Sequence, residues 1–217
     1  MADGDVANAA VVLAKGQCGE SLYLVDLAQS GVAREPVNSL DLARSYANLN
    51  FESAECELLG EAGEGQQMIS DLHDRAAVLF AFEQVGGAEA ALDMGRQYTT
   101  ERFAFGRPVA SFQAIKHKLA DMFVSKELAR SNAYYGAWAL SSGAEELPLA
   151  AARARVSAIA AYDECSRENI QAHGGMGFTW EFNCHLHYRR AHLLALVVGS
   201  GHYWRQLLAT RLLNAEV

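Results

Sequence analysis

One short segment of the sequence combines residue types that could bind a phosphorylated ligand. In Glu101-Arg-Phe-Ala-Phe-Gly-Arg-Pro108, Arg102 and Phe105 follow a long helical pattern, and Gln113 lies just beyond it. An arginine at a helix end can neutralise a pyrophosphate through directional hydrogen bonds, and a nearby aromatic ring can pack on a ring of the ligand. The structural alternative is that Arg102 forms a surface ion pair and that Gln113 caps a helix.

A second segment, Gln171-Ala-His-Gly-Gly-Met-Gly-Phe178, follows about 60 residues later at another expected helix junction. Paired glycines such as Gly174 and Gly175 allow backbone N–H groups to approach anionic oxygens closely. They are also typical of a plain helix end, because glycine readily adopts the left-handed conformation that closes a helix. Both interpretations are open at this point.

The first 64 residues carry short β-type runs that are separated by turn residues. The runs at 9–14, 21–25 and 46–51 are rich in apolar and β-branched residues, and Ser30-Gly31 marks a turn between two of them. A sheet of about four strands fits this length, but it would leave one apolar face and two edges open. We therefore expect only part of a β-domain.

After residue 65 the hydrophobic period changes from two to about 3.6 residues, which is typical of helices. The predicted helices are 67–101, a second from a cap at Ser111 to about 143, a third from 145 to 173, and a fourth over 185–213 with a break at 199–201. Short connections favour an up-and-down bundle. The expected fold class is α+β, mainly α: a partial β-domain over 1–64, then an up-and-down four-helix bundle over 65–217.

The two segments described first resemble the ERxxFGxPL…FQ and Q…GGxGF…E signatures of the acyl-CoA dehydrogenase family. Glu181 follows the glycine segment, as the second signature requires. Two matches in the expected order, both at helix junctions, are more specific than either alone. The resemblance extends over 1–217 and is to the second half of the family's middle β-domain and to its C-terminal four-helix domain.

The resemblance implies an FAD-dependent enzyme that introduces an α,β double bond into an acyl-CoA thioester. It assigns Arg102, Phe105 and Gln113 to one stretch of bound FAD. It assigns Gln171 and Gly174-Gly175 to the ADP portion of an FAD that a neighbouring subunit mainly holds. It also implies a homo-oligomer, or a hetero-oligomer with another acyl-CoA dehydrogenase chain.

The implied reaction requires a carboxylate that removes the α-proton of the thioester. Most members of the family carry it shortly after GGxGF, and counting from Gly174 puts Val198 there. Other members carry it near the start of the first bundle helix, where this sequence has Ala76, with Ala77 in place of a substrate-facing arginine. Neither valine nor alanine can accept a proton, so we expect no base at either position.

Glu83 is a weak candidate for a substitute base. It lies seven residues beyond Ala76 on a similar helix face, within an apolar stretch that could tune a carboxylate for this role. Two helical turns correspond to a shift of about 10 Å along the axis, too far without rearrangement. The favoured interpretation is a buried structural glutamate bonded to a neighbouring helix.

Composition excludes several classes of partner. Eighteen basic against twenty-six acidic residues give a net charge of −8, which disfavours nucleic acid. The four cysteines form no CxxC pair and the histidines no HExxH motif, so no metal site is expected. No apolar run approaches the roughly 18 residues of a membrane span, and the first residues are acidic, so we expect a cytoplasmic protein without membrane contact.

Three functions are compatible with these observations. The first is an FAD-dependent acyl-CoA dehydrogenase subunit that lacks its own catalytic base. The second is a non-catalytic structural partner of another dehydrogenase chain. The third is a related flavoprotein oxidase.

Overall fold

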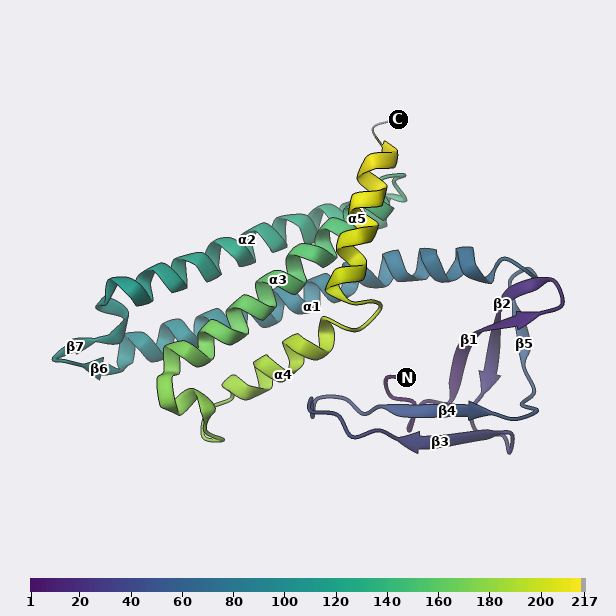
Figure 1. The fold of residues 1–217 in the computed structure, drawn as a ribbon, viewed down its shortest axis with the longest axis horizontal. Helices are drawn as coiled ribbons and strands as arrows, with labels where there is room; N and C mark the ends of the chain where they lie inside the picture. Colours follow the sequence, from purple (N-terminus) through teal and green to yellow (C-terminus); the bar gives the residue numbers. More distant parts are fainter. Residues whose placement is uncertain (216–217) are drawn as a thin grey trace. The chain divides into compact units, whose positions relative to one another are not determined.

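The computed structural model describes residues 1–215 and divides into two compact units. The first unit is Met1–His73, and the second begins at Asp74 (Figure 1). Helix α1 (Gly65–Glu101) belongs partly to each unit and starts where the sequence predicts the second domain to start. Residues 216 and 217, the end of that predicted domain, lie outside the described part of the chain.

The first unit is built from antiparallel strands. β1 and β2 form a hairpin in which Ala9 pairs with Asp26 and Gly16 with Gly19, and β5 adds to the other edge of β2. β3 and β4 pair with each other in a second small sheet. The strands are β1 (Ala9–Gly16), β2 (Gly19–Asp26), β3 (Val32–Pro36), β4 (Ala47–Phe51) and β5 (Glu57–Leu59).

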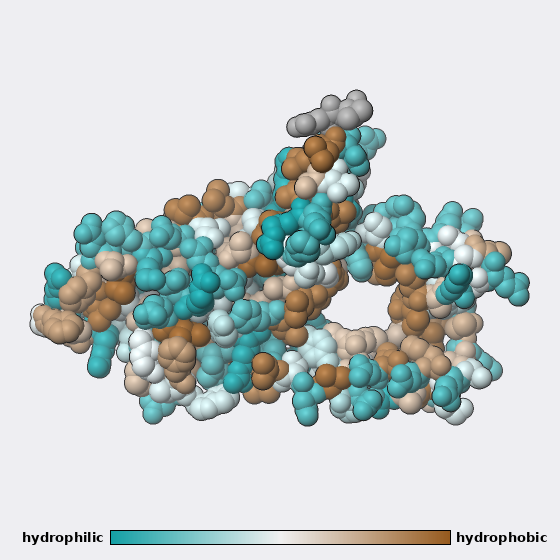
Figure 2. Space-filling view, in the orientation of Figure 1, coloured by the Kyte–Doolittle hydropathy of each residue, from teal (hydrophilic) through white to brown (hydrophobic). Residues whose placement is uncertain are grey.

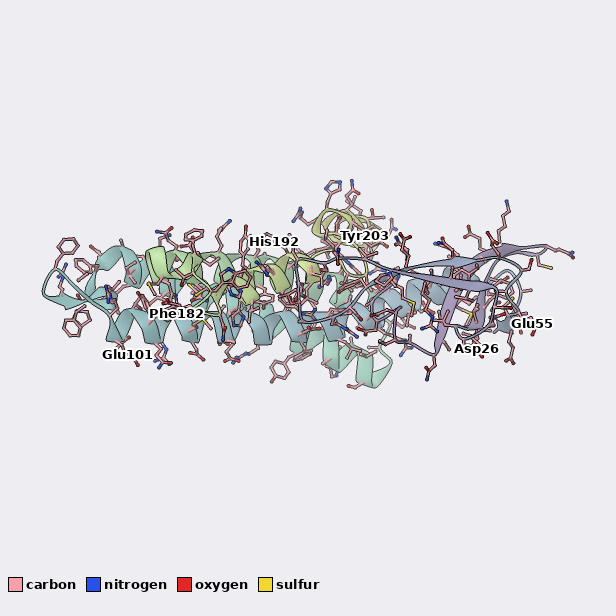
Figure 3. All side chains as sticks on the ribbon, turned by 90° about the horizontal axis from the view of Figure 1, so that it is seen from below. Asp26, Glu55, Glu101, Phe182, His192 and Tyr203 are labelled. Carbon is pink, nitrogen blue, oxygen red and sulfur yellow. The ribbon has the colours of Figure 1, made fainter. Side chains whose placement is uncertain are left out.

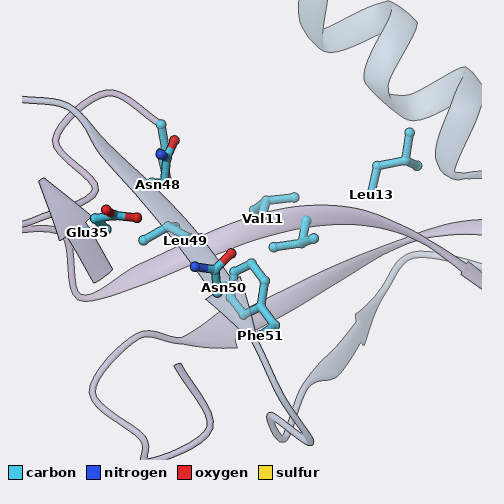
Figure 4. A pocket seen from close by; sticks show the side chains of 10 residues that line it. Val11, Leu13, Glu35, Asn48, Leu49, Asn50 and Phe51 are labelled. Carbon is cyan, nitrogen blue, oxygen red and sulfur yellow. The ribbon is translucent and has the colours of Figure 1, made fainter. Parts of the chain in front are cut away.

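These strands carry both buried and exposed apolar side chains. Leu22, Val25 and Leu27 are buried, whereas Val11 and Phe51 remain exposed. Both line a hollow of about 560 Å³ along β1 and β4, and Figure 4 shows the side chains around it. An apolar face is therefore uncovered in the described part of this unit, as the strand pattern predicts.

The second unit is a helical bundle in which α3 packs against α2, α4 and α5. The ends of α1 and α3 lie within two residues of the predicted ends. The fourth predicted helix consists of two helices, α4 and α5, and the break between them contains Gly199. The elements that follow α1 are β6 (Phe103–Ala104), β7 (Arg107–Pro108), the 3₁₀ turn η1 (Val109–Ser111), α2 (Gln113–Ser142), α3 (Leu147–His173), the 3₁₀ turn η2 (Gly174–Phe178), α4 (Cys184–Leu194) and α5 (Gly201–Ala215).

The start of α2 differs from the prediction. The N-cap is Phe112, which makes no side-chain cap hydrogen bond, and not Ser111. The Ser111 hydroxyl instead donates to the carbonyl of Pro108 at 2.7 Å, because residues 109–111 form a 3₁₀ turn of their own. The other end of α2 is a glycine cap, since Gly143 adopts a left-handed φ of 66° and its N–H bonds to Ala139.

The bundle core is rich in alanine, which lets the helices approach closely. Alanines of α1, α2 and α3 form one buried cluster that contains Ala81, Ala129, Ala133, Ala158 and Ala161. Larger buried side chains such as Met122, Tyr162 and Leu194 fill the wider part of the core. Within residues 1–215, no helix is both long and apolar enough to cross a membrane.

Candidate functional site

A groove of about 430 Å³ lies where the end of α1, the β6–β7 hairpin and the end of α3 meet. Its lining includes Arg102, Gln171, Gly174 and Gly175. Two segments that are about 60 residues apart in the sequence thus contribute to one concave surface. Four of the six residues that resemblance assigns to FAD are brought together here.

Arg102 is held at the groove by its backbone. Its N–H donates to Tyr98 and its carbonyl accepts from Val109, both at 2.8 Å, which ties the end of α1 to the segment after β7. The side chain is exposed and has no ion pair among the described residues. The guanidinium is therefore available for an anionic ligand.

The two glycines leave space beside the backbone of η2. A Cβ atom built on Gly174 or Gly175 would meet nothing within 4 Å, and Gly174 adopts a left-handed φ of 59°. Gly177 differs, because a Cβ there would lie 2.5 Å from the carbonyl oxygen of Ile170. The first two glycines thus open the groove, whereas the third permits close packing.

One wall of the groove consists of rings that were not foreseen from the sequence. His173 stacks on Tyr98 with centroids 4.1 Å apart, and Phe182, labelled in Figure 3, packs against both. Burial lowers the pKa of His173, whose Nδ1 lies 2.8 Å from the carbonyl oxygen of Asn169. His173 lies inside the second matched segment, and this position could have marked it as a residue of the groove.

Phe105 and Gln113 do not line this groove. Phe105 stands at the tip of the β6–β7 hairpin, where it and Gly106 both have a positive φ, 54° and 77°. Positive φ at both central residues is the geometry of a type I′ turn. Phe105 is 97% exposed, and its ring lies nearly perpendicular to that of Phe112, with 6.3 Å between the centroids. Gln113 is the exposed first residue of α2.

The positions expected for a catalytic base lie in apolar surroundings. Val198 packs on a buried cluster that contains Ala77, Val78 and Trp204. Val198 lies in the turn between α4 and α5 and has a left-handed φ of 51°. The indole N–H of Trp204 donates to the Val198 carbonyl at 3.0 Å and holds this turn. Ala76, half-buried, directly precedes Ala77 in α1. Neither position offers a group that could take a proton.

Glu83 does not have the environment that the sequence suggested. Its side chain is 40% exposed and forms an ion pair with Arg190 of α4, in which the guanidinium Nε lies 3.1 Å from Oε1. The expectation of burial among Phe and Leu is wrong, because the side chain turns toward α4. The expected bond to a neighbouring helix is present, and it gives Glu83 a structural role between α1 and α4.

Comparison with known proteins supports the family resemblance. The family model "Acyl-CoA dehydrogenase, C-terminal domain" matches residues 63–213. The acyl-CoA dehydrogenase IpdE2 of Mycobacterium tuberculosis is 34% identical over 198 residues, which is 91% of this chain and 55% of that protein. The human mitochondrial short-chain specific acyl-CoA dehydrogenase is 32% identical over 219 residues, covering 96% of this chain and 53% of that one.

Solved structures show the same relationship. Butyryl-CoA dehydrogenase from Megasphaera elsdenii superposes with a TM-score of 0.92 at 26% identity, over 98% of this chain and 58% of that one. A Tcur3481-Tcur3483 steroid ACAD superposes with a TM-score of 0.87 at 26% identity, over 97% and 56%. The chain spans about half the length of these relatives. With its signatures, its bundle and these matches together, the chain belongs to the acyl-CoA dehydrogenase family.

Proposed function

We propose that this chain is a subunit of an FAD-dependent acyl-CoA dehydrogenase, in which it helps to hold FAD at a subunit interface and another chain supplies the catalytic base. One contrast carries the proposal. The groove contains an exposed arginine, Arg102, and open backbone at Gly174-Gly175, which are residue types that suit a dinucleotide. The positions for the base, Val198 and Ala76, do not retain a carboxylate.

The residues of the groove fit the ADP half of FAD. The exposed guanidinium of Arg102 can pair with a pyrophosphate, and the open backbone at Gly174-Gly175 can donate N–H groups to its oxygens. Gln171 adds an amide at the same surface. FAD, when bound, supplies the acceptor for the hydride that leaves the β-carbon of the acyl-CoA.

Phe105 and Gln113 lie outside the groove, and we assign both to contacts with the same cofactor. The turn of the hairpin presents the Phe105 ring almost fully to solvent, although a positive φ is unfavourable for a bulky residue. Strained, exposed positions of this kind are often functional. We assign the ring to packing on a cofactor that a neighbouring subunit holds.

Removal of the α-proton requires a carboxylate from elsewhere in the assembly. Val198 and Ala77 meet in one apolar cluster, and Glu83 is engaged by Arg190. A partner chain of the same family, which keeps its base, would satisfy the chemistry.

The relative described as a Tcur3481-Tcur3483 steroid ACAD carries a two-part name, and we propose a hetero-oligomer for this chain as well. The acyl-CoA class of substrate and a cytoplasmic location complete the proposal.

The cofactor role is tested by flavin content. We expect Arg102→Ala to lower the FAD retained by the purified complex, because loss of a charge pair at a desolvated interface typically costs about 2–5 kcal/mol. Arg107→Ala is the matched control: it removes the same charge from the same hairpin, where Arg107 stacks on Phe112 at 3.9 Å and does not line the groove. Equal flavin content in both variants and the wild type would contradict the assignment.

The source of the base is tested by anaerobic mixing with saturated acyl-CoA. The chain alone, supplied with FAD, should not bleach the flavin, because losing a general base commonly removes about 10²–10⁴ of rate. In a complex with a base-carrying chain, bleaching should return and should persist in Glu83→Gln. Bleaching by the isolated chain would refute the proposal, and its loss in Glu83→Gln would move the base to Glu83.

The missing base also favours a second candidate function, that of a non-catalytic structural partner. The two candidates differ in one observable. A complex whose flavin content is unchanged by both Arg102→Ala and a Gly174→Val substitution would favour the structural role.

A further inference from the structure

A second cavity, of about 490 Å³, lies in the bundle unit between α3, η2 and α4, with one side chain from α2. It shares only Gln171 with the groove of Arg102 and is otherwise lined by different residues. Its volume is in the range of pockets that bind small organic ligands, which is about 300–1,000 Å³. None of its other lining residues takes part in the function proposed above.

The imidazole of His185 forms part of the cavity wall. Both of its ring nitrogens are buried, and neither has a hydrogen-bond partner among the described residues. The ring is held edge-on against Trp180, with centroids 4.4 Å apart. A neutral imidazole carries one donor and one acceptor nitrogen, and buried polar atoms nearly always have partners. Because neither nitrogen is accessible from the cavity, a ligand there packs against the ring and does not bond to these atoms.

The charged side chains around the cavity leave a positive excess. Lys118 is neutralised by Glu168 at 2.5 Å. Arg167 is exposed and only loosely paired, with 3.7 Å to Asp163. The guanidinium of Arg189 lies 4.9 Å from the centroid of the Trp180 ring and has no ion pair among residues 1–215. In a chain of net charge −8, this excess is a local feature that favours an anionic ligand.

Flat apolar surfaces lie beside these charges. Phe178 and Tyr188 line the cavity, and the Phe178 ring is 81% exposed. Aromatic faces bind planar bases by stacking, and guanidinium groups bind phosphate oxygens through paired hydrogen bonds. A ligand that combines a planar base with a phosphate would use both features at once.

We propose that this cavity binds a nucleoside monophosphate, with its phosphate at Arg189 and Arg167 and its base against Phe178 and Tyr188. The ring of His185 contributes to the wall beside them. The site is separate from the cofactor groove and does not depend on the function proposed for that groove.

The test is a titration of the full chain with AMP, followed by the fluorescence of Trp180, which lies between His185 and Arg189. Trp180→Phe identifies the responding signal among the three tryptophans. We expect saturable quenching. Arg189→Gln should weaken AMP binding at least about tenfold, because it removes one charged hydrogen bond to the phosphate. Arg205→Gln, which removes the same charge from an exposed position on α5, should leave it unchanged.

Two further arms separate the site from its alternatives. Adenosine and inorganic phosphate should each bind more weakly than AMP, because each lacks half of the recognised chemistry. Arg102→Ala should leave the quenching of Trp180 by AMP intact, because Arg102 lies in the other groove. No saturable quenching by AMP, equal weakening by Arg205→Gln, or loss of binding in Arg102→Ala but not in Arg189→Gln would overturn the proposal. Thermal melting of each variant shows that it is folded.

Discussion

Arg155 is a fully buried charge in the bundle core without a carboxylate hydrogen-bonded to it in the described chain. It donates to the side-chain oxygen of Gln84 at 2.5 Å, to the carbonyl of Val197 at 2.7 Å and to the carbonyl of Leu194. Burial lowers its pKa to about 10, so it stays protonated at neutral pH. Two of these bonds go to the carbonyl of Leu194, the last residue of α4, and to the carbonyl of Val197 in the turn that follows. Arg155 thereby fixes the turn that presents Val198.

Replacing Arg155 should be costly. We expect Arg155→Ala to lower the free energy of unfolding by about 3 kcal/mol, because it leaves buried acceptors unpaired and opens a cavity. Arg205→Ala, which removes an exposed arginine from α5, should change it by less than about 0.5 kcal/mol. Urea denaturation monitored by circular dichroism measures both. Matching midpoints for the two variants would show that the bonds of Arg155 contribute little.

At the scale of elements, the crossing of α1 and α3 depends on which of two adjacent glycines faces the partner helix. A Cβ atom on Gly87 would overlap the ring of Tyr162, which is buried and whose hydroxyl lies 3.3 Å from Nδ1 of His187. A Cβ atom on Gly86 would meet nothing within 4 Å. Gly86 and Gly87 are therefore adjacent glycines of the same helix, but only Gly87 packs against α3.

This pair gives a matched test of the packing. Gly87→Ala should destabilise the chain by about 1–3 kcal/mol, because the tightly packed ring cannot move away freely. Gly86→Ala should be neutral or stabilise by up to about 1 kcal/mol, since alanine is the better helix former. Thermal or urea unfolding of both variants decides. Stabilisation by both substitutions would mean that α1 and α3 can separate at little cost.

The sequence predicted elements best where they are long and end at glycine or proline. The periodic pattern located α1 and α3, and Gly199-Ser-Gly201 marked the break between α4 and α5. Two-residue strands such as β6 and β7 carry no period, so the hairpin was not foreseen. Ser111 was misjudged because a 3₁₀ turn precedes α2, and such a turn leaves no distinct sequence signal.

The candidate site was predicted unevenly for a related reason. Motif spacing identified Arg102 and the glycines, whose convergence on one groove depends only on where helices end. Spacing along one helix gave Glu83 a plausible position but could not show its ion pair, because Arg190 is 107 residues away in the sequence. Contacts between distant segments depend on packing, which local patterns do not encode.

At the scale of the whole molecule, the described surface carries many exposed apolar side chains. Several lie on α2, and Figure 2 shows hydrophobic residues among the polar ones along the bundle. On α2 they include Phe123, Val124, Leu128, Tyr134 and Trp138. Scattered exposed leucines are normal, but a succession along one helix is typical of a protein interface. Aromatic residues in particular are enriched at such contacts.

We therefore expect that the chain is not monomeric and that α2 takes part in its association. Light scattering at micromolar concentration should give a mass well above 23.5 kDa. Leu128→Glu, at a side chain that is 62% exposed in the single chain, should weaken association at least about tenfold, because a carboxylate would be buried without a partner. Leu40→Glu, at an exposed loop position of the first unit, is the control and should leave the mass unchanged. A stable monomer of the wild type would contradict the expectation, and an unchanged mass of Leu128→Glu would place the interface on another helix.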